Sequence, residues 1–342
     1  MKTVPEKILV VRNDKLGDFM LSYPCFDLLK QYLPDTEIHA LVQAYTKPMA
    51  GLCKSIDRVQ IDPGKAAGFK GILSLARALR QEKYDAVITL YSTTRIGLAL
   101  LLAGIPYRLA PATKLAQLFY NKRLKQRRSR SLRPEYLYNR DLAEKFLQDW
   151  QIPLTDYPSP PYLEFGQEEI QTLRDDFFRQ HHVPPASKLV FIHPGSGGSA
   201  NNLSVAQFAR LARHLTGSTP WRLVITAGPG EEQQARQLAR LTEALHPIVY
   251  ISQQGLPAFS RLLALADVFI SGSTGPLHIA GALDRPTAGF YTRRRSATSL
   301  RWQTLNSEAR RLAFSPPEEA ETEDMSQVDI PSAAEVISRK FL

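Results

Sequence analysis

Cysteine is scarce in this chain: Cys25 and Cys53 are the only two in 342 residues. Two cysteines exclude a disulfide scaffold and fit a reducing compartment. The sequence also lacks a His/Cys cluster with metal-ligand spacing and has no Asp-x-Asp pair. We therefore expect no metal site and no cofactor.

Long hydrophobic runs are absent as well. The most apolar stretch, Ile96–Ile105, is too short to span a bilayer. Near the N-terminus the apolar run Ile8–Val11 ends at Arg12, which is too short for the core of a signal peptide and predicts a first strand. These observations favour a cytoplasmic protein that is at most peripheral to a membrane.

Acidic residues are outnumbered, with 33 Asp and Glu against 43 Lys and Arg, a net charge of +10. Such an excess favours an anionic partner: a nucleic acid, a phospholipid surface or a phosphorylated substrate. Hydrophobic residues make up 44% of the chain, which is typical of a globular protein. The length suits two domains of ordinary size.

Short β-branched runs alternate with helical patterns, which predicts an α/β fold with two parallel sheets. The predicted strands are 7–12, 37–42, 86–90, 107–110, 188–192, 222–226, 248–251, 268–270 and 287–290. Helices are expected at 19–33, 69–81 and 167–180, and another after residue 204, where Ser204 and Gln207 form a capping box. The proline-rich segment 151–165 predicts a linker. We place the domains at 1–165 and 166–342, two Rossmann-like, doubly wound units facing a cleft.

The segment Arg12–Asp18 directly follows the first predicted strand. A carboxylate at Asp18 is placed to act as a general base toward a sugar hydroxyl. The alternative is that Asp18 only caps the next helix, since Asp is a favoured N-cap residue.

Two loops in the second half are rich in Gly, Ser and Thr: His193–Asn202, and Ser271–His278 after the strand 268–270. Small residues let backbone N–H groups approach phosphate oxygens, and the helix that follows each loop adds its positive end. In the second loop Pro276 is expected to begin a helix that Gly275 caps. Neither loop is a Walker or a GxGxxG motif, and an ordinary flexible loop is the alternative for the first. Two anion sites in one domain suit a diphosphate.

The segment Gly228–Glu232 follows another predicted strand. A carboxylate from Glu231 or Glu232 at this position suits the hydroxyls of a ribose. Acidic residues that merely favour the first turn of a helix are the alternative.

A basic run extends from Lys114 to Arg133, with seven cations between 122 and 133. It is typical of a segment that binds a polyanion or a membrane surface, and a solvated loop is the alternative. Stacking aromatics are limited to Phe119 and Tyr120, so we do not expect nucleic acid as the partner.

Taken together, three segments resemble the lipopolysaccharide heptosyltransferases, which are inverting transferases with the GT-B fold. The segments are ILVVRNDKLGDFMLSYP at the start, FIHPGSGG in the middle and ISGSTGPLHIAGAL near the end. The resemblance implies transfer of a heptose from ADP-heptose to a lipopolysaccharide core acceptor, an anionic glycolipid, without a metal ion.

The resemblance also implies a role for individual residues. Asp18 becomes the catalytic base, and the N-terminal domain receives the acceptor. The implied donor-binding residues are His193, Ser196, Gly197, Asn201, Gly228, Glu231, Glu232, Ser273, Thr274, Gly275, Pro276, Leu277 and His278. The implied acceptor-binding residues are Asn13, Lys15, Lys122, Arg123, Arg127, Arg128 and Arg130.

Two departures from the family pattern concern the donor. Ser273 stands where many members carry an Asp that contacts the donor sugar, and Asn201-Asn202-Leu203 stands where many carry a Lys–Arg–Trp-like run. Arg293–Arg295 would have to offset the missing lysine. The sequence thus leaves open another nucleotide sugar or acceptor, an epimerase or hydrolase of the same architecture, and a non-catalytic relative that binds polyanions or lipids.

Overall fold

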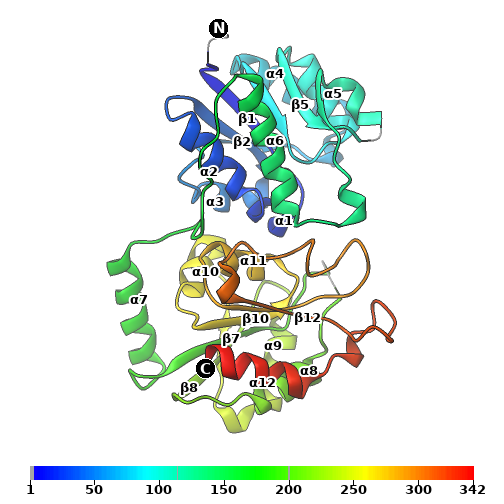
Figure 1. Cartoon of the computed structure of the whole chain (residues 1–342). Coiled ribbons are helices and arrows are strands. Elements are labelled where there is room, and N and C mark those ends of the chain that lie inside the picture. The colour runs from blue at the N-terminus through cyan, green and yellow to red at the C-terminus, as the bar shows by residue number, and fades with distance from the viewer. Residues whose placement is uncertain (1–3, 114, 199–200) are drawn as a thin grey trace. The chain divides into compact units, whose positions relative to one another are not determined.

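The computed structural model describes residues 4–113, 115–198 and 201–342. Lys114, Ser199 and Ala200 of the predicted basic run and first Gly-rich loop lie outside these residues. The chain divides into two compact units. Unit 1 runs to Arg128 and includes Leu132–Tyr162, and unit 2 comprises Ser129–Ser131 and Leu163–Leu342 (Figure 1).

Unit 1 is a six-stranded parallel sheet in the order β3-β2-β1-β4-β5-β6. Its strands are β1 (Lys7–Val11), β2 (Glu37–Gln43), β3 (Arg58–Asp62), β4 (Ala86–Thr89), β5 (Tyr107–Pro111) and β6 (Lys122–Leu124). Its α-helices are α1 (Leu16–Met20), α2 (Tyr23–Tyr32), α3 (Lys47–Ala50), α4 (Gly68–Gln81), α5 (Thr94–Leu102) and α6 (Glu135–Asp149). Short 3-10 helices are η1 (Ala44–Thr46), η2 (Lys65–Ala67), η3 (Leu115–Phe119) and η4 (Arg128–Arg130).

Unit 2 repeats this topology, with the order β12-β11-β10-β7-β8-β9 and parallel pairing throughout. Its strands are β7 (Lys188–His193), β8 (Trp221–Ala227), β9 (Ile248–Ile251), β10 (Val268–Gly272), β11 (Thr287–Phe290) and β12 (Arg311–Phe314). Its α-helices are α7 (Gln167–Gln180), α8 (Val205–His214), α9 (Glu232–Leu241), α10 (Gly255–Leu263), α11 (Gly275–Ala282) and α12 (Ile330–Phe341). Its 3-10 helices are η5 (Glu243–Leu245), η6 (Glu308–Arg310) and η7 (Met325–Gln327).

Both sheets therefore have the strand order of the Rossmann fold, and the predicted α/β class is confirmed. Helices cover both faces of each sheet (Figure 1). The strands at the centre are buried on both faces, so they consist of nearly continuous apolar residues, as in β1 and β7.

Some predicted elements differ from the observed ones. The helix expected over 19–33 is two helices, α1 and α2, because Ser22 donates a hydrogen bond to the Phe19 carbonyl (2.5 Å) and Pro24 begins a new helix. The strands β3, β6 and β12 were not predicted. All three are edge strands, which pair on one side only and therefore need little apolar sequence.

The caps in unit 2 were predicted with mixed success. The capping box of α8 is confirmed, with Ser204 and Gln207 each accepting a hydrogen bond from the other's backbone N–H. The N-cap of α11 was predicted wrongly: it is Thr274, and Gly275 is already helical.

No helix among the described residues combines the length and the apolar character that crossing a membrane requires.

Candidate active site

The predicted motifs lie at equivalent places in the two units. In unit 1 the strand order reverses between β1 and β4, and the segment Arg12–Asp18 follows β1. In unit 2 the reversal is between β7 and β10, and each of these strands ends in one of the two Gly-rich loops. Open α/β sheets bind ligands outside the carboxyl ends of their strands at this point. Each unit thus presents its candidate residues where its own fold favours a ligand.

A buried guanidinium organises the motif of unit 1. Arg12 is 2% exposed and donates through Nε to Asp14 (2.8 Å) and through Nη2 to Asp18 (2.6 Å). Its Nη1 reaches two residues of α6, Glu135 at 3.4 Å and Asn139 at 3.1 Å. The alternative that Asp18 caps α1 is wrong, because the N-cap residue is Lys15 and the Asp18 carboxylate accepts from Arg12. Arg12 therefore fixes the orientation of Asp18.

Asp14 is the second carboxylate on the same guanidinium. Burial raises the pKa of Asp14 to about 7, and the neighbouring charge of Asp18 adds to the rise while Arg12 opposes it. Asp14 and Arg12 were not predicted as site residues, because the contacts of Arg12 with Asp14 and Asp18 cannot be read from their spacing in the sequence.

A second polar cluster lies beside Asn13. The Asn13 amide donates to Asp62 at the end of β3 (2.6 Å), and Arg95 in the first turn of α5 donates to the same carboxylate oxygen. Although burial opposes the shift, the hydrogen bond from Arg95 holds the pKa of Asp62 below its ordinary value. Oδ1 of Asn13 and Nη1 of Arg95 are buried without a hydrogen-bond partner among the described residues. Unpaired buried polar atoms at the strand ends are suited to a polar ligand, so Asp62 and Arg95 join Asn13 as candidates.

The cations of the basic run have different surroundings: Arg128 binds neighbouring elements, and several others are exposed. Arg128 donates to Glu135 (2.8 Å) and to the carbonyls of Leu90 and Tyr138, which ties the loop after β6 to α6 and β4. In contrast, several other predicted cations of the run are exposed: Lys122, Arg123, Arg127 and Arg130. Lys15, also predicted to bind the acceptor, is exposed as well.

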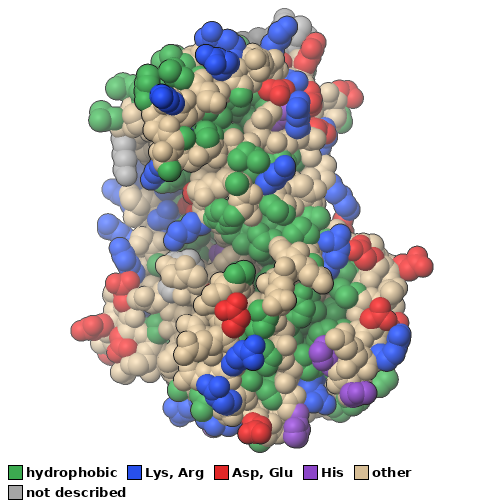
Figure 2. All heavy atoms as spheres, turned by 180° about the vertical axis from the view of Figure 1, so that it is seen from behind, with side chains coloured by type: hydrophobic (Ala, Val, Ile, Leu, Met, Phe, Trp, Pro, Cys, Tyr) green, Lys and Arg blue, Asp and Glu red, His purple; other side chains and the backbone are tan. Residues whose placement is uncertain are grey.

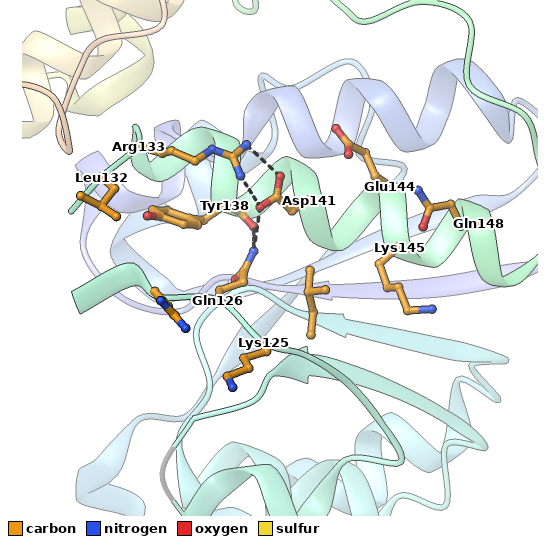
Figure 3. A pocket seen from close by; sticks show the side chains of 11 residues that line it. Lys125, Gln126, Leu132, Arg133, Tyr138, Asp141, Glu144, Lys145 and Gln148 are labelled. Carbon is orange, nitrogen blue, oxygen red and sulfur yellow. Dashed lines mark hydrogen bonds and ion pairs between the residues drawn. The ribbon is translucent and has the colours of Figure 1, made fainter. Parts of the chain in front are cut away.

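A pocket of about 400 Å³ lies between β6 and α6 (Figure 3). On one wall Arg133 donates to both oxygens of Asp141 (3.0 and 3.1 Å), and Gln126 donates to Tyr138 O (2.7 Å). The lining carries four cations, Lys125, Arg127, Arg133 and Lys145, against the two carboxylates of Asp141 and Glu144, so its net charge is positive. Asp18 is not part of it. We do not assign this pocket to the active site.

Glu231 joins the two loops that follow β7 and β8 in unit 2. Its carboxylate accepts from the backbone N–H groups of Gly197 (2.8 Å) and Gly228 (3.0 Å) and lies 3.2 Å from His193 Nε2. The other ring nitrogen of His193 is 3.0 Å from the Thr226 hydroxyl. A Cβ on Gly195 would lie 2.2 Å from the Glu231 carboxyl, so a larger residue there would displace this carboxyl from its hydrogen bonds. His193 and Glu231 therefore shape the loop, and both ring nitrogens of His193 are already occupied.

The charge of Glu231 contributes to stability. The hydrogen bond from His193 and the two backbone N–H groups lower the pKa of Glu231 to about 2, against 4.5 ordinarily. A lowered pKa means that this contribution is present above pH 4.5 and is lost as the pH falls toward 2. We expect Glu231→Gln to cost about 2 kcal/mol at pH 7. Thermal denaturation should show a melting temperature lower by about 4–8 °C.

Glu232 provides the matched control, because its carboxylate accepts only one loop hydrogen bond, from Gly230 N (3.1 Å). Glu232→Gln should change the melting temperature by less than about 2 °C. The difference in melting temperature between the wild type and Glu231→Gln should be smaller at pH 3 than at pH 7. A difference that stays constant down to pH 3 would contradict the stabilising role of the Glu231 charge.

The loop after β10 supplies the start of α11. Pro276 has no N–H, and the His278 N–H donates to Thr274 O (3.3 Å), so the donors left in this turn, among the residues the structure describes, are those of Gly275 and Leu277. The His278 side chain is 3% exposed, and burial lowers its pKa to about 4. It is therefore neutral at pH 7, and its Nδ1 is buried with no partner among the described residues. This turn offers an anion two backbone donors and an imidazole.

Asn202 connects the two Gly-rich loops. Its amide donates to Pro194 O (3.1 Å), its Oδ1 accepts from Leu203 N (2.9 Å), and a Cβ on Gly272 would lie 2.4 Å from that oxygen. The predicted donor ligand Asn201 is exposed. Asn201 was thus predicted as a donor ligand, whereas its neighbour Asn202, which was not, holds the loop against the end of β10.

The basic cluster Arg293–Arg295 has partners of its own. Arg293 donates to Pro317 O (2.8 Å), and Arg294 pairs with Glu323 (3.4 Å). These two arginines fasten the segment after β11 to residues 317–323. To take the place of the missing lysine, as predicted from the sequence, Arg293 and Arg294 would have to give up these contacts.

Comparisons with known proteins agree with this geometry. The model of glycosyltransferase family 9 (heptosyltransferase) matches residues 72–327. A Haemophilus influenzae protein provisionally named a glycosyltransferase is 43% identical over 97% of this chain and 96% of its own length. The lipopolysaccharide core heptosyltransferase OpsX of the same organism is 22% identical over 84% of this chain and 79% of its own. The structure of Escherichia coli ADP-heptose lipopolysaccharide heptosyltransferase II superposes with a TM-score of 0.76 at 17% identity, covering 98% of both chains.

The solved structure supports the fold, two Rossmann-like units as in GT-B enzymes, and the family model and the 43% identical relative establish the family. The resemblance drawn from the three sequence segments is confirmed. This chain belongs to glycosyltransferase family 9, the heptosyltransferase family, and is a glycosyltransferase.

Proposed function

We propose that the chain is an inverting, metal-independent transferase that moves a heptose from ADP-heptose onto a lipopolysaccharide core acceptor. Relatives that are 22–26% identical to it are named lipopolysaccharide heptosyltransferases. The observation that supports the proposal most is the Asp18 carboxylate, which Arg12 holds through Oδ1 beside the carboxyl end of β1.

The reaction is a single displacement. Asp18 takes the proton of an acceptor hydroxyl through Oδ2 while that oxygen forms a bond to the anomeric carbon. The bond from the anomeric carbon to the diphosphate oxygen breaks on the opposite face, and ADP leaves with the electron pair. The configuration at the anomeric carbon is thereby inverted.

The departing negative charge needs fixed donors. In unit 2 we assign this role to the N–H groups of Gly275 and Leu277, to the imidazole of His278, and to Ser196 in the loop after β7, whereas the N–H of Gly197 already donates to Glu231. In this proposal the chain itself supplies the donors, and no metal ion takes part. Glu231 acts by shaping the loop, and Glu232 is left as the carboxylate for the ribose.

Replacing His278 tests the donor site directly. We expect His278→Ala to weaken ADP binding by about tenfold, because a buried hydrogen bond to a charged group is lost. Calorimetric titration with ADP measures this. His214→Ala, a change at an exposed histidine, should leave the affinity unchanged. Equal affinities for wild type and His278→Ala would remove His278 from the donor site.

The donor and the acceptor are identified by a thermal-shift and turnover screen of the purified chain against nucleotide sugars. Stabilisation by ADP-heptose and transfer to a lipopolysaccharide core acceptor would support the proposal. Stabilisation by a different nucleotide sugar would favour the second candidate, a transferase with another donor, which Ser273 and Asn201 suggest. If no nucleotide sugar stabilises the protein, the proposed function is wrong.

A further inference from the structure

The positive charge of the chain is concentrated in one part of unit 1. Residues 63–134 carry fifteen Lys and Arg but only two acidic residues, Glu82 and Asp85. The net charge of the whole chain is +10, so the remainder is slightly acidic. Several of these cations are exposed on or next to α4: Lys65, Lys70, Arg77 and Arg80.

The same segment exposes large apolar side chains on three elements. On α4, Phe69, Leu73 and Arg77 follow one another at a spacing of four residues and are all exposed, so they share one face of the helix. In η3, Leu115 is 74% exposed and Leu118 is 71% exposed. The third element, α5, exposes Leu101 and Leu102 at its end.

These three elements form one continuous surface. Arg80 at the end of α4 donates to the Leu102 carbonyl at the end of α5 (2.5 Å). A Cβ on Gly97 of α5 would lie 2.9 Å from the Phe119 side chain, so η3 packs directly on α5. Beneath them, residues of α4 and α5 share one buried apolar cluster. We call this surface the α4–α5–η3 face.

Figure 2 shows this face at the upper left of the view, where hydrophobic side chains gather and Lys and Arg side chains lie beside them. Exposed cations on or next to the face include Lys70 and Arg77 in α4 and Lys65 in the preceding η2. Exposed leucines surrounded by cations are unusual on a surface that meets only water. Leucine side chains together with cations are the combination that binds the headgroup region of an anionic bilayer.

We propose that the α4–α5–η3 face docks on an anionic phospholipid membrane. The leucines and Phe69 enter the boundary between headgroups and acyl chains, while the cations contact lipid phosphates. Nucleic acid fits the face less well, because it offers leucines where stacking would need aromatic rings. The inference does not depend on the sugar or nucleotide of the proposed function.

Vesicle flotation tests the proposal with the full chain and no nucleotide sugar. The wild type should bind vesicles of phosphatidylethanolamine with one-third phosphatidylglycerol at least tenfold more tightly than vesicles of phosphatidylcholine. The double variant Leu115→Ser/Leu118→Ser should lose at least tenfold of that binding, because two exposed leucines no longer enter the bilayer. The triple variant Lys65→Gln/Lys70→Gln/Arg77→Gln should lose the part of the binding that high salt also removes.

Leu241→Ser/Leu300→Ser is the matched control, since both leucines are exposed and belong to unit 2. This control should bind vesicles like the wild type, and melting temperatures of all variants should agree within about 2 °C. The double variant should keep wild-type turnover on a soluble acceptor. Failure of the vesicle test would therefore leave the transferase assignment intact, and failure of the transferase assignment would leave the vesicle result intact. Absence of binding to anionic vesicles, equal binding to both vesicle types, or an unchanged double variant would overturn the proposal. Binding to a single-stranded oligonucleotide in place of vesicles would overturn it too.

Discussion

Replacing Asp18 with Asn should lower the turnover number for sugar transfer by about 10³-fold, within the range that general bases contribute. The amide keeps the size of the side chain and an oxygen for Arg12, but it cannot take the proton of the acceptor hydroxyl. Initial rates at saturating donor and acceptor measure the effect. The affinity for ADP should stay within about twofold, because the assigned donor groups belong to unit 2 and the change is in unit 1.

Asp14→Asn is the control for the Asp18 variant, since it removes a neighbouring carboxylate from the same guanidinium. Its effect on turnover should be small beside that of Asp18→Asn. If Asp18→Asn retained more than a tenth of the wild-type turnover, or if Asp14→Asn were the more damaging change, Asp18 would not be the base.

The pH dependence of stability tests whether Asp14→Asn is a suitable control. The pKa of Asp14 is raised from 3.8 to about 7, so its favourable contribution is present below pH 3.8 and is lost as the pH rises through 7. Asp14→Asn removes a charge that is costly to bury above that pH. The control variant should therefore melt no lower than the wild type at pH 8, which shows that its effect on turnover is not caused by unfolding.

Strand ends could be predicted from the sequence, and with them most of the candidate site. The buried central strands consist of continuous apolar residues, so β1, β7 and β10 were all expected within two residues of their observed ends. Because parallel strands end at a common edge, the motifs after them were placed correctly without any knowledge of side-chain contacts.

Contacts between distant residues could not be predicted in this way. Glu231 reaches Gly197 across 34 positions, and Asn13 reaches Asp62 across 49. The spacing assigned Glu231 or Glu232 to a ribose because a carboxylate at a strand end has that role in dinucleotide folds. In the structure the Glu231 oxygens accept hydrogen bonds from the backbone N–H groups of two loops, and a contact of this kind cannot be read from the spacing. The edge strand β6 was missed for a related reason, since its exposed lysine and arginine resemble a loop.

The two units hold their functional loops in the same manner. In unit 1 the cation of Arg12 fixes the segment after β1, and in unit 2 the anion of Glu231 fixes the segment after β7. Each ionic group is largely buried and has several partners, which is the condition under which such a group stabilises a unique arrangement. Both loops are thereby held in place by residues that need not touch a substrate.

Arg12→Met should be the most destabilising of the substitutions considered for this protein. Methionine fills a similar volume, but Asp14 and Asp18 would then lie close together without their shared cation, whereas Glu135 keeps its ion pair with Arg128. Breaking a buried ion pair from one side costs about 3–5 kcal/mol. The melting transition of the variant should fall by roughly 10 °C, as measured by thermal denaturation at pH 7.

Removing one of the two carboxylates that lose their cation should reverse much of this loss. The double variant Arg12→Met/Asp14→Asn keeps Glu135 paired with Arg128 and leaves Asp18 as the only carboxylate without its cation, so we expect it to recover at least half of the lost stability. The single variant should also gain stability relative to the wild type as the pH falls from 8 to 5, because Asp14 and Asp18 can then take up a proton. Arg12→Met that melts like the wild type, or a double variant no more stable than the single one, would mean that the cluster does not hold Asp18 in place. In that case the orientation of the base would have to come from α1 alone.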